Sequence, residues 1–238
     1  MIELALREQV CQANRDLASA GLVVLSWGNA SGVDRDAGVL VIKPSGLACA
    51  AVEPEDLVVV SLADGSVVEG RLRPSSDTPT HLRLYQAFPE IGGVVHTHSS
   101  YAAAFAQAGR DIPCLGTTHA DHFRGAVPVS RHMTEAEIEG AYETETGNVV
   151  IETIGERVGA EALRMPAVLV RSHGPFTWGR DARRAAENAI ALEATAAMAH
   201  RTLALEPGAP AVQEALLRRH FDRKHGPGAY YGQPGDVY

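Results

Sequence analysis

The sequence predicts a single α/β domain with a central, mainly antiparallel β-sheet that is flanked by helices on both faces. Short apolar runs typical of strands occur both in a hairpin and in alternation with helical segments. No linker, repeat or low-complexity segment divides the 238 residues, and a chain of this length can bury a substantial core. We therefore expect one domain over residues 1–238, with a C-terminal tail from about residue 222 to residue 238.

The first third of the chain combines one helix with several short strands. Residues 2–19 place apolar side chains at helical spacing, and Gly21 is a typical helix-ending residue. The segment 63–65 reads Ala-Asp-Gly, which is a hairpin turn signal between two β-like runs. Apolar runs bounded by turn residues predict strands at 22–25, 39–42, 57–62 and 66–70.

Helices and strands alternate through the rest of the chain. Pro79 suits the first turn of a helix, and Thr134 with Glu137 forms a capping box that opens an acidic helix. Asp181 can cap a long helix that continues to about Leu205. The remaining predictions are a helix at 78–88, a strand at 92–98, a helix at 101–109, a strand at 167–174 and a last helix at 211–221.

The composition excludes several classes of protein. The net charge of −8 disfavours non-specific binding to nucleic acid or to a membrane surface, because both need a basic surface; a local basic pocket for a small anion stays possible. No signal peptide and no membrane-spanning apolar run is present, so we expect a cytoplasmic protein. The three cysteines are scattered and form no CxxC pair, which indicates free thiols in a reducing compartment.

Two histidines one residue apart, His96 and His98, directly follow an apolar run. Alternate side chains of a strand share one face, so the two imidazoles would converge. His173 stands at the end of another predicted strand. Two histidines from one strand and a third from a distant strand are typical of a catalytic metal site with an open position. Strand histidines that only form hydrogen bonds are the alternative.

Three small polar turns, at 27–32, 43–46 and 74–81, indicate an anion-binding site. Small side chains allow backbone N–H groups to approach a phosphate, and Lys43 adds positive charge. The chain contains no phosphate-binding GxxxxGK[ST] or GxGxxG motif, so nucleotide binding is not indicated. Ordinary turn chemistry is the alternative for each loop, and Asp77 stands where it could simply cap a helix.

Two other segments hold candidate residues. Asp121 lies in a predicted loop, where a solvated or capping aspartate is the simpler interpretation. Tyr230 and Tyr231 follow a Gly/Pro hinge in the tail, which is typical of an arm that docks on the chain's own core or on a neighbouring subunit. His220 reads most simply as an exposed residue near a helix end.

Several long stretches, taken together, resemble the class II aldolase and epimerase family. They occur in the family's order from residue 2 to residue 233, and within the family they are most similar to members that epimerise L-ribulose 5-phosphate at C4. The resemblance is weakest around 154–164, and the last residues after Gln233 are an additional tail. The stretches are WGNASGVDR, VIKPSG, PSSDTPTH, IGGVVHTHS, GTTHAD, ETGNV, SHGPFTWG and KHGPGAYYGQ.

This resemblance implies a role for each candidate residue. Zinc, or another divalent metal such as Mn²⁺, is expected to be bound by His96, His98 and His173, with Asp77 as a nearby or fourth ligand. The substrate phosphate is expected to be held by Gly28, Asn29, Ser45, Gly46, Ser75 and Ser76, with Lys43 close by. The acid/base pair is expected to be Asp121 and Tyr231, supplied by a neighbouring subunit of a four-fold symmetric homotetramer, with the tail at the subunit interface and His220 assisting.

The implied activity is the interconversion of L-ribulose 5-phosphate and D-xylulose 5-phosphate in L-arabinose breakdown, by metal-assisted cleavage and re-formation of the C3–C4 bond. One alternative is a sugar-phosphate aldolase, such as one for L-fuculose 1-phosphate, and such members carry Glu where this chain has Asp77. A relative that acts on another pentulose 5-phosphate is a second alternative. The third is a non-catalytic metal- and sugar-phosphate-binding protein, which would need neither Asp121 nor Tyr231.

Overall fold

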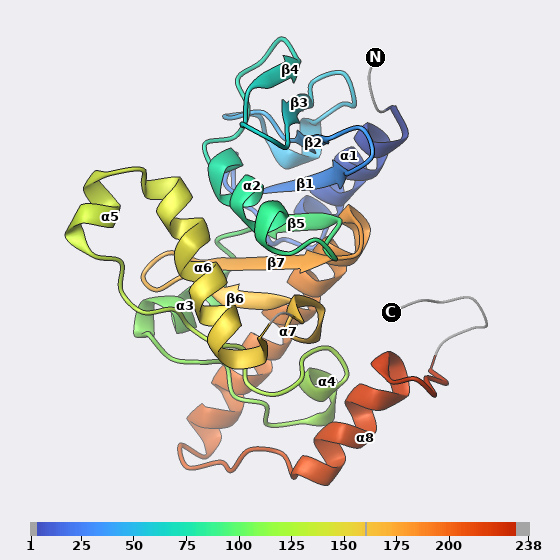
Figure 1. Cartoon of the computed structure of the whole chain (residues 1–238). Coiled ribbons are helices and arrows are strands. Elements are labelled where there is room, and N and C mark those ends of the chain that lie inside the picture. The colour runs from blue at the N-terminus through green and yellow to red at the C-terminus, as the bar shows by residue number, and fades with distance from the viewer. Residues whose placement is uncertain (1–3, 160, 232–238) are drawn as a thin grey trace.

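A seven-stranded sheet forms the centre of the molecule, in the order β4-β3-β2-β1-β5-β7-β6 (Figure 1). The computed structural model describes residues 4–159 and 161–231. Every neighbouring pair of strands is antiparallel, which confirms the predicted mainly antiparallel sheet. The strands are β1 (Asn29–Asp34), β2 (Val39–Ile42), β3 (Val58–Ser61), β4 (Val67–Glu69), β5 (Gly93–His96), β6 (Ala167–Leu169) and β7 (Pro175–Gly179).

Helices cover both faces of this sheet, as predicted (Figure 1). Helices α2, α3 and α6 pack against one face, and α1 with the first half of α7 packs against the other. No helix among the described residues is long and apolar enough to cross a membrane. The helices are α1 (Leu4–Ser19), α2 (Thr78–Ala87), α3 (Ser100–Ala108), α4 (Thr117–Ala120), α5 (Glu135–Glu139), α6 (Tyr142–Val158), α7 (Ala182–Leu205) and α8 (Glu214–His225), with short 3₁₀ turns at Cys49–Ala51 and Ala162–Arg164.

Strand β2 shows why two cores exist. Leu40 and Ile42 belong to the core beneath α2 and α6, whereas Val39 and Val41 belong to the core beneath α1 and α7. Successive side chains of a strand point to opposite faces, so an unbroken apolar strand is buried on both sides. The sheet is thereby held between two helical layers, and its strand ends have fixed positions.

The predicted strand at 22–25 is wrong. These residues form an irregular connection between α1 and β1, in which Leu25 has a φ of 56°. Val24 and Leu25 are 57% and 74% exposed. Leu22, at 5% exposure, belongs to the core and Val23 packs against it, but the run has no partner strand.

Two strands, β1 and β7, were not predicted. Residues 29–34 of β1 are rich in small and polar side chains with low strand propensity, yet they lie centrally between β2 and β5. Gly32 is needed in β1 because α1 packs closely on it: a Cβ at this position would come within 2.8 Å of Leu6 Cδ1 on α1. Strand β7 begins at Pro175 and follows the short β6, so the strand predicted over 167–174 ends early, at Leu169.

Several helix ends also differ from the predictions. The capping box of Thr134 is present, but α5 ends before Gly140 and the longer α6 starts at Tyr142. Helix α8 begins at Glu214 and continues to His225, so the predicted tail begins inside a helix. Helices α4 and α8 pack together away from the sheet (Figure 1). Residues 232–238 of the predicted tail lie outside the described residues.

Candidate active site

The candidate metal site lies where β5 ends beside the turn between β6 and β7. His96 is the last residue of β5, His98 follows the strand, and His173 lies in the turn. The assigned strand ends at His96, two residues before the predicted end at His98. The N–H of Thr97 still donates to the carbonyl oxygen of Pro175 at 3.3 Å, and the Nε2 atoms of His96 and His98 lie 3.0 Å apart. One nitrogen from each of the three histidines lies within 4.8 Å of the others.

His96 is held rigidly by β7. Its Nδ1 donates a hydrogen bond to the carbonyl oxygen of Pro175 at 3.0 Å, because a carbonyl can only accept. The ring stacks on Phe176, its cross-strand partner, with centroids 4.3 Å apart. Gly174 permits this approach, since a Cβ there would lie 2.6 Å from the carbonyl oxygen of Thr97. The Nε2 lone pair of His96 therefore faces the other two histidines.

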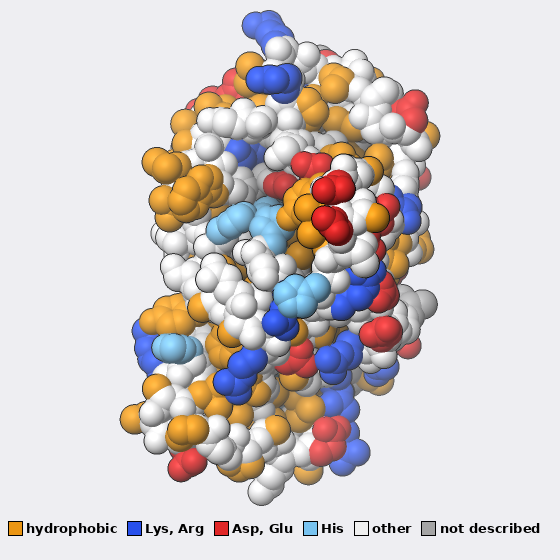
Figure 2. Space-filling model, turned by 90° about the vertical axis from the view of Figure 1, so that its left-hand side faces the viewer, with side chains coloured by type: hydrophobic (Ala, Val, Ile, Leu, Met, Phe, Trp, Pro, Cys, Tyr) orange, Lys and Arg blue, Asp and Glu red, His pale blue; other side chains and the backbone are white. Residues whose placement is uncertain are grey.

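The protonation state of the cluster suits a metal ion. Burial lowers the pKa of His96 to about 3, and burial also lowers the pKa of His98 and of His173. All three rings are then neutral near pH 7, which is the form that binds metals. His96 is buried while His98 is exposed, so one side of the cluster stays accessible. On the face of the molecule shown in Figure 2, histidine side chains reach the surface in a hollow. The three residues fit a divalent cation with an open position.

Asp77 lies beside this cluster, in the same pocket. It occupies the N-cap position of α2, but its side chain makes no capping hydrogen bond. Its Oδ2 instead accepts a hydrogen bond from Asn29 Nδ2 at 2.6 Å. Burial alone would raise the pKa of Asp77, but His96, His81 and the Asn29 hydrogen bond together lower it, so the carboxylate is charged. Its place as a fourth metal ligand stays a prediction.

The predicted phosphate loops surround the same pocket. Asn29 on β1 pairs directly with His96 on β5, so the sheet register places a loop residue beside the metal cluster. Gly28 has a φ of 83°, and a Cβ there would lie 2.8 Å from the carbonyl oxygen of His96. The pocket has a volume of about 660 Å³. Every predicted phosphate-binding residue lines it, namely Gly28, Asn29, Lys43, Ser45, Gly46, Ser75 and Ser76.

Lys43 is the buried cation of this pocket, with an exposure of 1%. Its ammonium donates hydrogen bonds to the carbonyl oxygens of Pro44 at 3.1 Å and Leu47 at 2.5 Å. Burial lowers the pKa of the ammonium group, and the negative charges of Cys49, when ionised, and Asp77 act in the opposite direction. A third acceptor, the carbonyl oxygen of Ser26, lies 3.5 Å from Nζ, so each of the three N–H donors of Lys43 has a carbonyl oxygen within reach.

Comparisons with known proteins agree with this geometry. The model of the class II aldolase and adducin N-terminal domain matches residues 8–200. The chain belongs to this family. It is 54% identical over 228 residues to a protein of Salmonella paratyphi A named L-ribulose-5-phosphate 4-epimerase UlaF, and the match covers 96% of this chain and 98% of that protein.

Solved structures show that the fold is that of the class II aldolases. A protein named L-fuculose 1-phosphate aldolase superposes with a TM-score of 0.76 at 23% identity, over 94% of this chain and 97% of that one. An L-fuculose-1-phosphate aldolase of Thermus thermophilus gives a TM-score of 0.67 at 23% identity, over 86% of this chain and 98% of that one. At these identities the similarity concerns the fold.

Three residues that line the pocket of this class II aldolase-like chain, Ser26, Tyr142 and Glu143, were not singled out in the sequence. Tyr142 and Glu143 are the first two residues of α6. The hydroxyl of Tyr142 lies 3.4 Å from His173 Nδ1. The ETGNV stretch that follows belongs to the family resemblance, but no sequence spacing connects residue 142 to residue 173.

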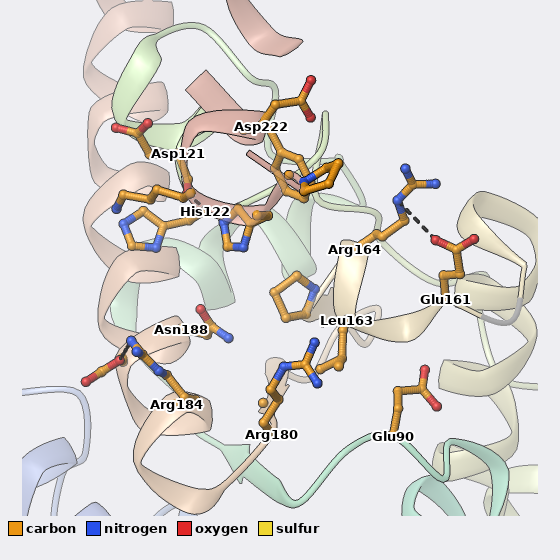
Figure 3. Close-up of a pocket in the computed structure, with 18 residues that line it drawn as sticks. Glu90, Asp121, His122, Glu161, Leu163, Arg164, Arg180, Arg184, Asn188 and Asp222 are labelled. Atoms are coloured by element: carbon orange, nitrogen blue, oxygen red, sulfur yellow. Dashed lines mark hydrogen bonds and ion pairs between the residues drawn. The ribbon is translucent and has the colours of Figure 1, made fainter. Parts of the chain in front are cut away.

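Asp121 and Tyr231 do not line the histidine pocket of the same chain. Asp121 follows α4 and lines a separate cavity of about 670 Å³ between α7 and α8 (Figure 3). Tyr231 is 44% exposed and follows α8. Their predicted position in the site of a neighbouring copy agrees with this separation and stays a prediction.

Proposed function

We propose that this chain interconverts L-ribulose 5-phosphate and D-xylulose 5-phosphate as a metal-dependent 4-epimerase. The observation that carries the proposal is one pocket in which three neutral histidines face glycine- and serine-lined loops. The 54% identity to the protein named L-ribulose-5-phosphate 4-epimerase UlaF supports this substrate. L-arabinose breakdown, the expected source of that substrate, stays a prediction.

The substrate phosphate would be held by the loops around Gly28, Ser45 and Ser75. Ser75 and Ser76 offer hydroxyl donors, and the left-handed backbone at Gly28 and Gly46 exposes peptide groups to an anion. Asn29 Nδ2 is already bonded to Ser75 Oγ at 3.0 Å, which orients two polar side chains toward one another. These groups would retain the phosphorylated fragment while the carbon skeleton is broken and re-formed.

A divalent metal, proposed to be zinc, would be bound by His96, His98 and His173. When bound, it would supply Lewis-acid stabilisation of the negative charge that develops on the C2 and C3 oxygens as C3–C4 breaks. The Pro175 hydrogen bond would keep the His96 ring in its metal-binding tautomer. Asp77 would add a negative charge beside the cluster or a further ligand.

Inversion at C4 needs two proton-transfer groups. A base takes the proton of the C4 hydroxyl, C3–C4 breaks to leave glycolaldehyde phosphate and an enediolate, and the aldehyde turns so that its other face is attacked. An acid then donates a proton to the new C4 alkoxide. We propose that Asp121 and Tyr231 of a second copy supply these groups, one for each C4 epimer, within a homotetramer.

Two other functions make different predictions. A class II sugar-phosphate aldolase would release free aldehyde in stoichiometric yield. A non-catalytic sugar-phosphate-binding protein would bind metal and ligand without turnover. The Asp77 side chain, one methylene shorter than the glutamate expected of the aldolases, favours the epimerase, and so does the identity to the UlaF protein.

The deciding experiment is an assay of L-ribulose 5-phosphate with purified protein, after chelation and with Zn²⁺ or Mn²⁺ restored. D-xylulose 5-phosphate and free glycolaldehyde phosphate are both followed. Metal-dependent formation of D-xylulose 5-phosphate without free aldehyde supports the proposal. Accumulation of free aldehyde indicates an aldolase. If neither product forms, the substrate assignment is overturned. Metal analysis of untreated protein identifies the resident ion.

The proposed location is the cytoplasm. Cys11, Cys49 and Cys114 are all buried free thiols, which suits a reducing compartment. Fractionation of the source cells would test this, and recovery with an extracytoplasmic fraction would contradict it.

A further inference from the structure

Arg223 on α8 forms a bidentate ion pair with Asp121. Its Nε donates to Oδ1 at 2.9 Å and its Nη2 donates to Oδ2 at 2.7 Å. Both side chains are well covered, with exposures of 24% and 13%. A planar guanidinium that engages both carboxylate oxygens fixes the carboxylate in its plane as well as in position.

The same residue also holds the segment that carries Tyr231. The Arg223 guanidinium carbon lies 4.9 Å from the centroid of the Tyr231 ring. The Arg223 carbonyl oxygen accepts hydrogen bonds from the backbone N–H groups of Tyr230 at 2.9 Å and Tyr231 at 3.1 Å. The chain therefore folds back after α8, and the ring of Tyr231 is placed over the guanidinium that binds Asp121.

Other side chains contact either Asp121 or Tyr231. His220 Nδ1 lies 3.0 Å from Asp121 Oδ1, and Lys224 Nζ lies 4.6 Å from the centroid of Tyr231. His225 Nε2 donates to the backbone oxygen of Asp121 at 3.0 Å. The two candidate acid/base groups come from segments 110 positions apart in the sequence, and the Arg223 side chain touches both.

We infer that Arg223 is a positioning residue that sets the separation and orientation of Asp121 and Tyr231 as one unit. The inference rests on the proposed function, in which these residues serve the two C4 epimers. Each must stay aligned while the aldehyde turns between cleavage and re-formation of the bond. A misplacement of about 1 Å can lower a rate by roughly 10²-fold, so the rigidity of this unit determines turnover.

The test is Arg223→Lys, which keeps the charge but loses the bidentate fork and the planar stack. We expect kcat to fall roughly 10- to 100-fold, with KM and metal content changed much less. The matched control is Arg219→Lys on the same helix, whose guanidinium lies 5.8 Å from the Tyr230 ring centroid. The control should keep wild-type kcat, and an equal loss in both variants would overturn the inference.

The pH dependence of kcat/KM distinguishes a role of Arg223 in positioning Asp121 from a role in stabilising α8 only. Burial alone would raise the pKa of Asp121, but hydrogen bonds from Arg223 and His220 lower it below its usual value. The other titratable groups around it are His122, Lys224 and His225. Arg223→Lys should therefore shift the acid limb of kcat/KM to higher pH. A lower thermal midpoint with an unchanged profile and kcat would indicate a purely structural role and overturn the inference.

Double variants distinguish this inference from the proposed function. If Arg223 acts through Asp121, Arg223→Lys should cost much less in an Asp121→Asn background than in the wild type. If Asp121→Asn is inactive but Arg223→Lys is fully active, the inference about Arg223 is overturned and the proposed function is not. If the wild type shows no epimerase turnover, the inference and the proposed function are both overturned. Guanidinium rescue of Arg223→Ala gives a second measurement, in which recovered kcat supports positioning and no recovery in folded protein contradicts it.

Discussion

His96 uses its two ring nitrogens for different purposes. Nδ1 is bonded to Pro175 and Nε2 faces His98 at 3.0 Å, while burial keeps the ring neutral. Two neutral ring nitrogens this close share at most one hydrogen bond, and a cation between the rings would satisfy both lone pairs. The geometry of a single residue thus favours metal binding.

His96→Asn should remove metal and turnover together. The loss should exceed the roughly 10- to 100-fold expected when only an outer hydrogen-bond partner is removed. Metal analysis and the epimerase assay on the same preparation measure both quantities. His132→Asn is the control, because His132 is exposed. Full activity of His96→Asn in metal-free buffer would eliminate the metal mechanism.

Tyr231→Phe tests the phenol separately from the ring. The variant keeps the ring over Arg223 and should therefore fold and bind metal normally. Loss of one acid/base group should lower turnover roughly 10²- to 10⁴-fold, as measured by steady-state kinetics. Tyr230→Phe is the neighbouring control. Wild-type rates for Tyr231→Phe would make the segment a docking arm only.

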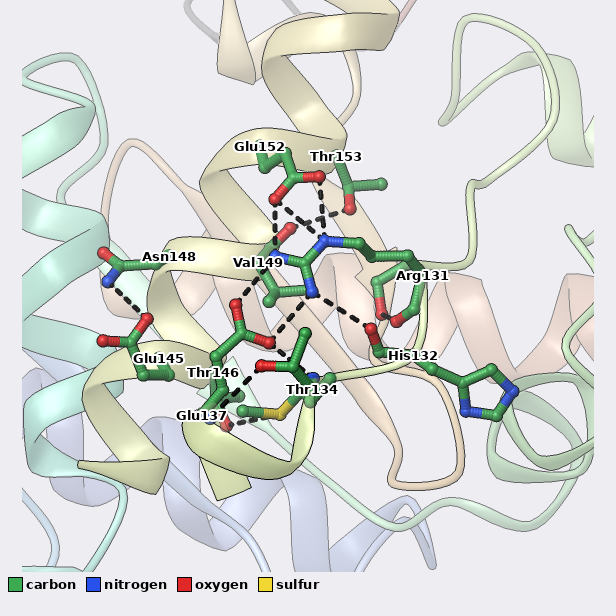
Figure 4. A network of polar contacts seen from close by, with 12 residues as sticks. Arg131, His132, Thr134, Glu137, Glu145, Thr146, Asn148, Val149, Glu152 and Thr153 are labelled. Atoms are coloured by element: carbon green, nitrogen blue, oxygen red, sulfur yellow. Dashed lines mark hydrogen bonds and ion pairs between the residues drawn. The ribbon is translucent and has the colours of Figure 1, made fainter. Parts of the chain in front are cut away.

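At the scale of elements, Arg131 connects α5 to α6 (Figure 4). It forms ion pairs with Glu137 at 2.9 Å and with Glu152 at 2.8 Å. Glu137 also accepts a hydrogen bond from the backbone N–H of Thr134 within the capping box. This network holds the short α5 against α6, whose first residue, Tyr142, lines the pocket.

The network should stabilise the protein in a pH-dependent way. Hydrogen bonds from Arg131, with a smaller contribution from Thr134, lower the pKa of Glu137 to about 2. The stabilisation is therefore fully present above the unfolded pKa of about 4.3 and is lost as pH falls toward the folded value. The difference in thermal midpoint between wild type and Arg131→Ala should shrink over this interval. A difference that does not change with pH would contradict this origin.

Gly93→Ala should destabilise the junction between β5 and α7. A Cβ at Gly93 would lie 2.4 Å from the carbonyl carbon and oxygen of Asp181, so backbone must move. We expect a loss of roughly 1–3 kcal/mol in the free energy of unfolding, measured by chemical denaturation. Gly155→Ala is the control, because its Cβ meets open space within α6 and should stabilise slightly. Equal stability of the two variants would contradict this prediction and show that α7 can shift to accommodate the added Cβ without cost.

At the scale of the whole molecule, the proposed site needs residues from two copies. Mixing inactive His96→Asn with inactive Tyr231→Phe should restore activity after subunit exchange, because some sites combine an intact cluster with an intact tyrosine. Random mixing in a cyclic tetramer predicts about a quarter of wild-type activity. Activity that never exceeds that of the separate variants would contradict the shared site.

Much of the architecture could be predicted from local sequence. The apolar run 39–42, the helix that starts after Asp181 and the capping box at Thr134 each carry their own signal, and each is present. Strand β1 could not be found in this way, because its small polar residues become a strand only through pairing with β2 and β5. Helix α8 begins later than predicted, and just before it the N–H of Val212 donates to the carbonyl oxygen of Cys114 at 2.9 Å, a contact between distant segments.

The sequence by itself determined the family, the fold class and the residue types of the pocket, since distinctive motifs and periodicity are local properties. Tertiary structure decided which of those residues meet. The sheet register places Asn29 opposite His96, and the turn before β7 brings His173 to within 4.8 Å of the other two histidines. It also placed Asp121 and Tyr231 together on Arg223, away from the histidine pocket. Contacts between distant segments depend on strand pairing and helix packing, which no local pattern encodes.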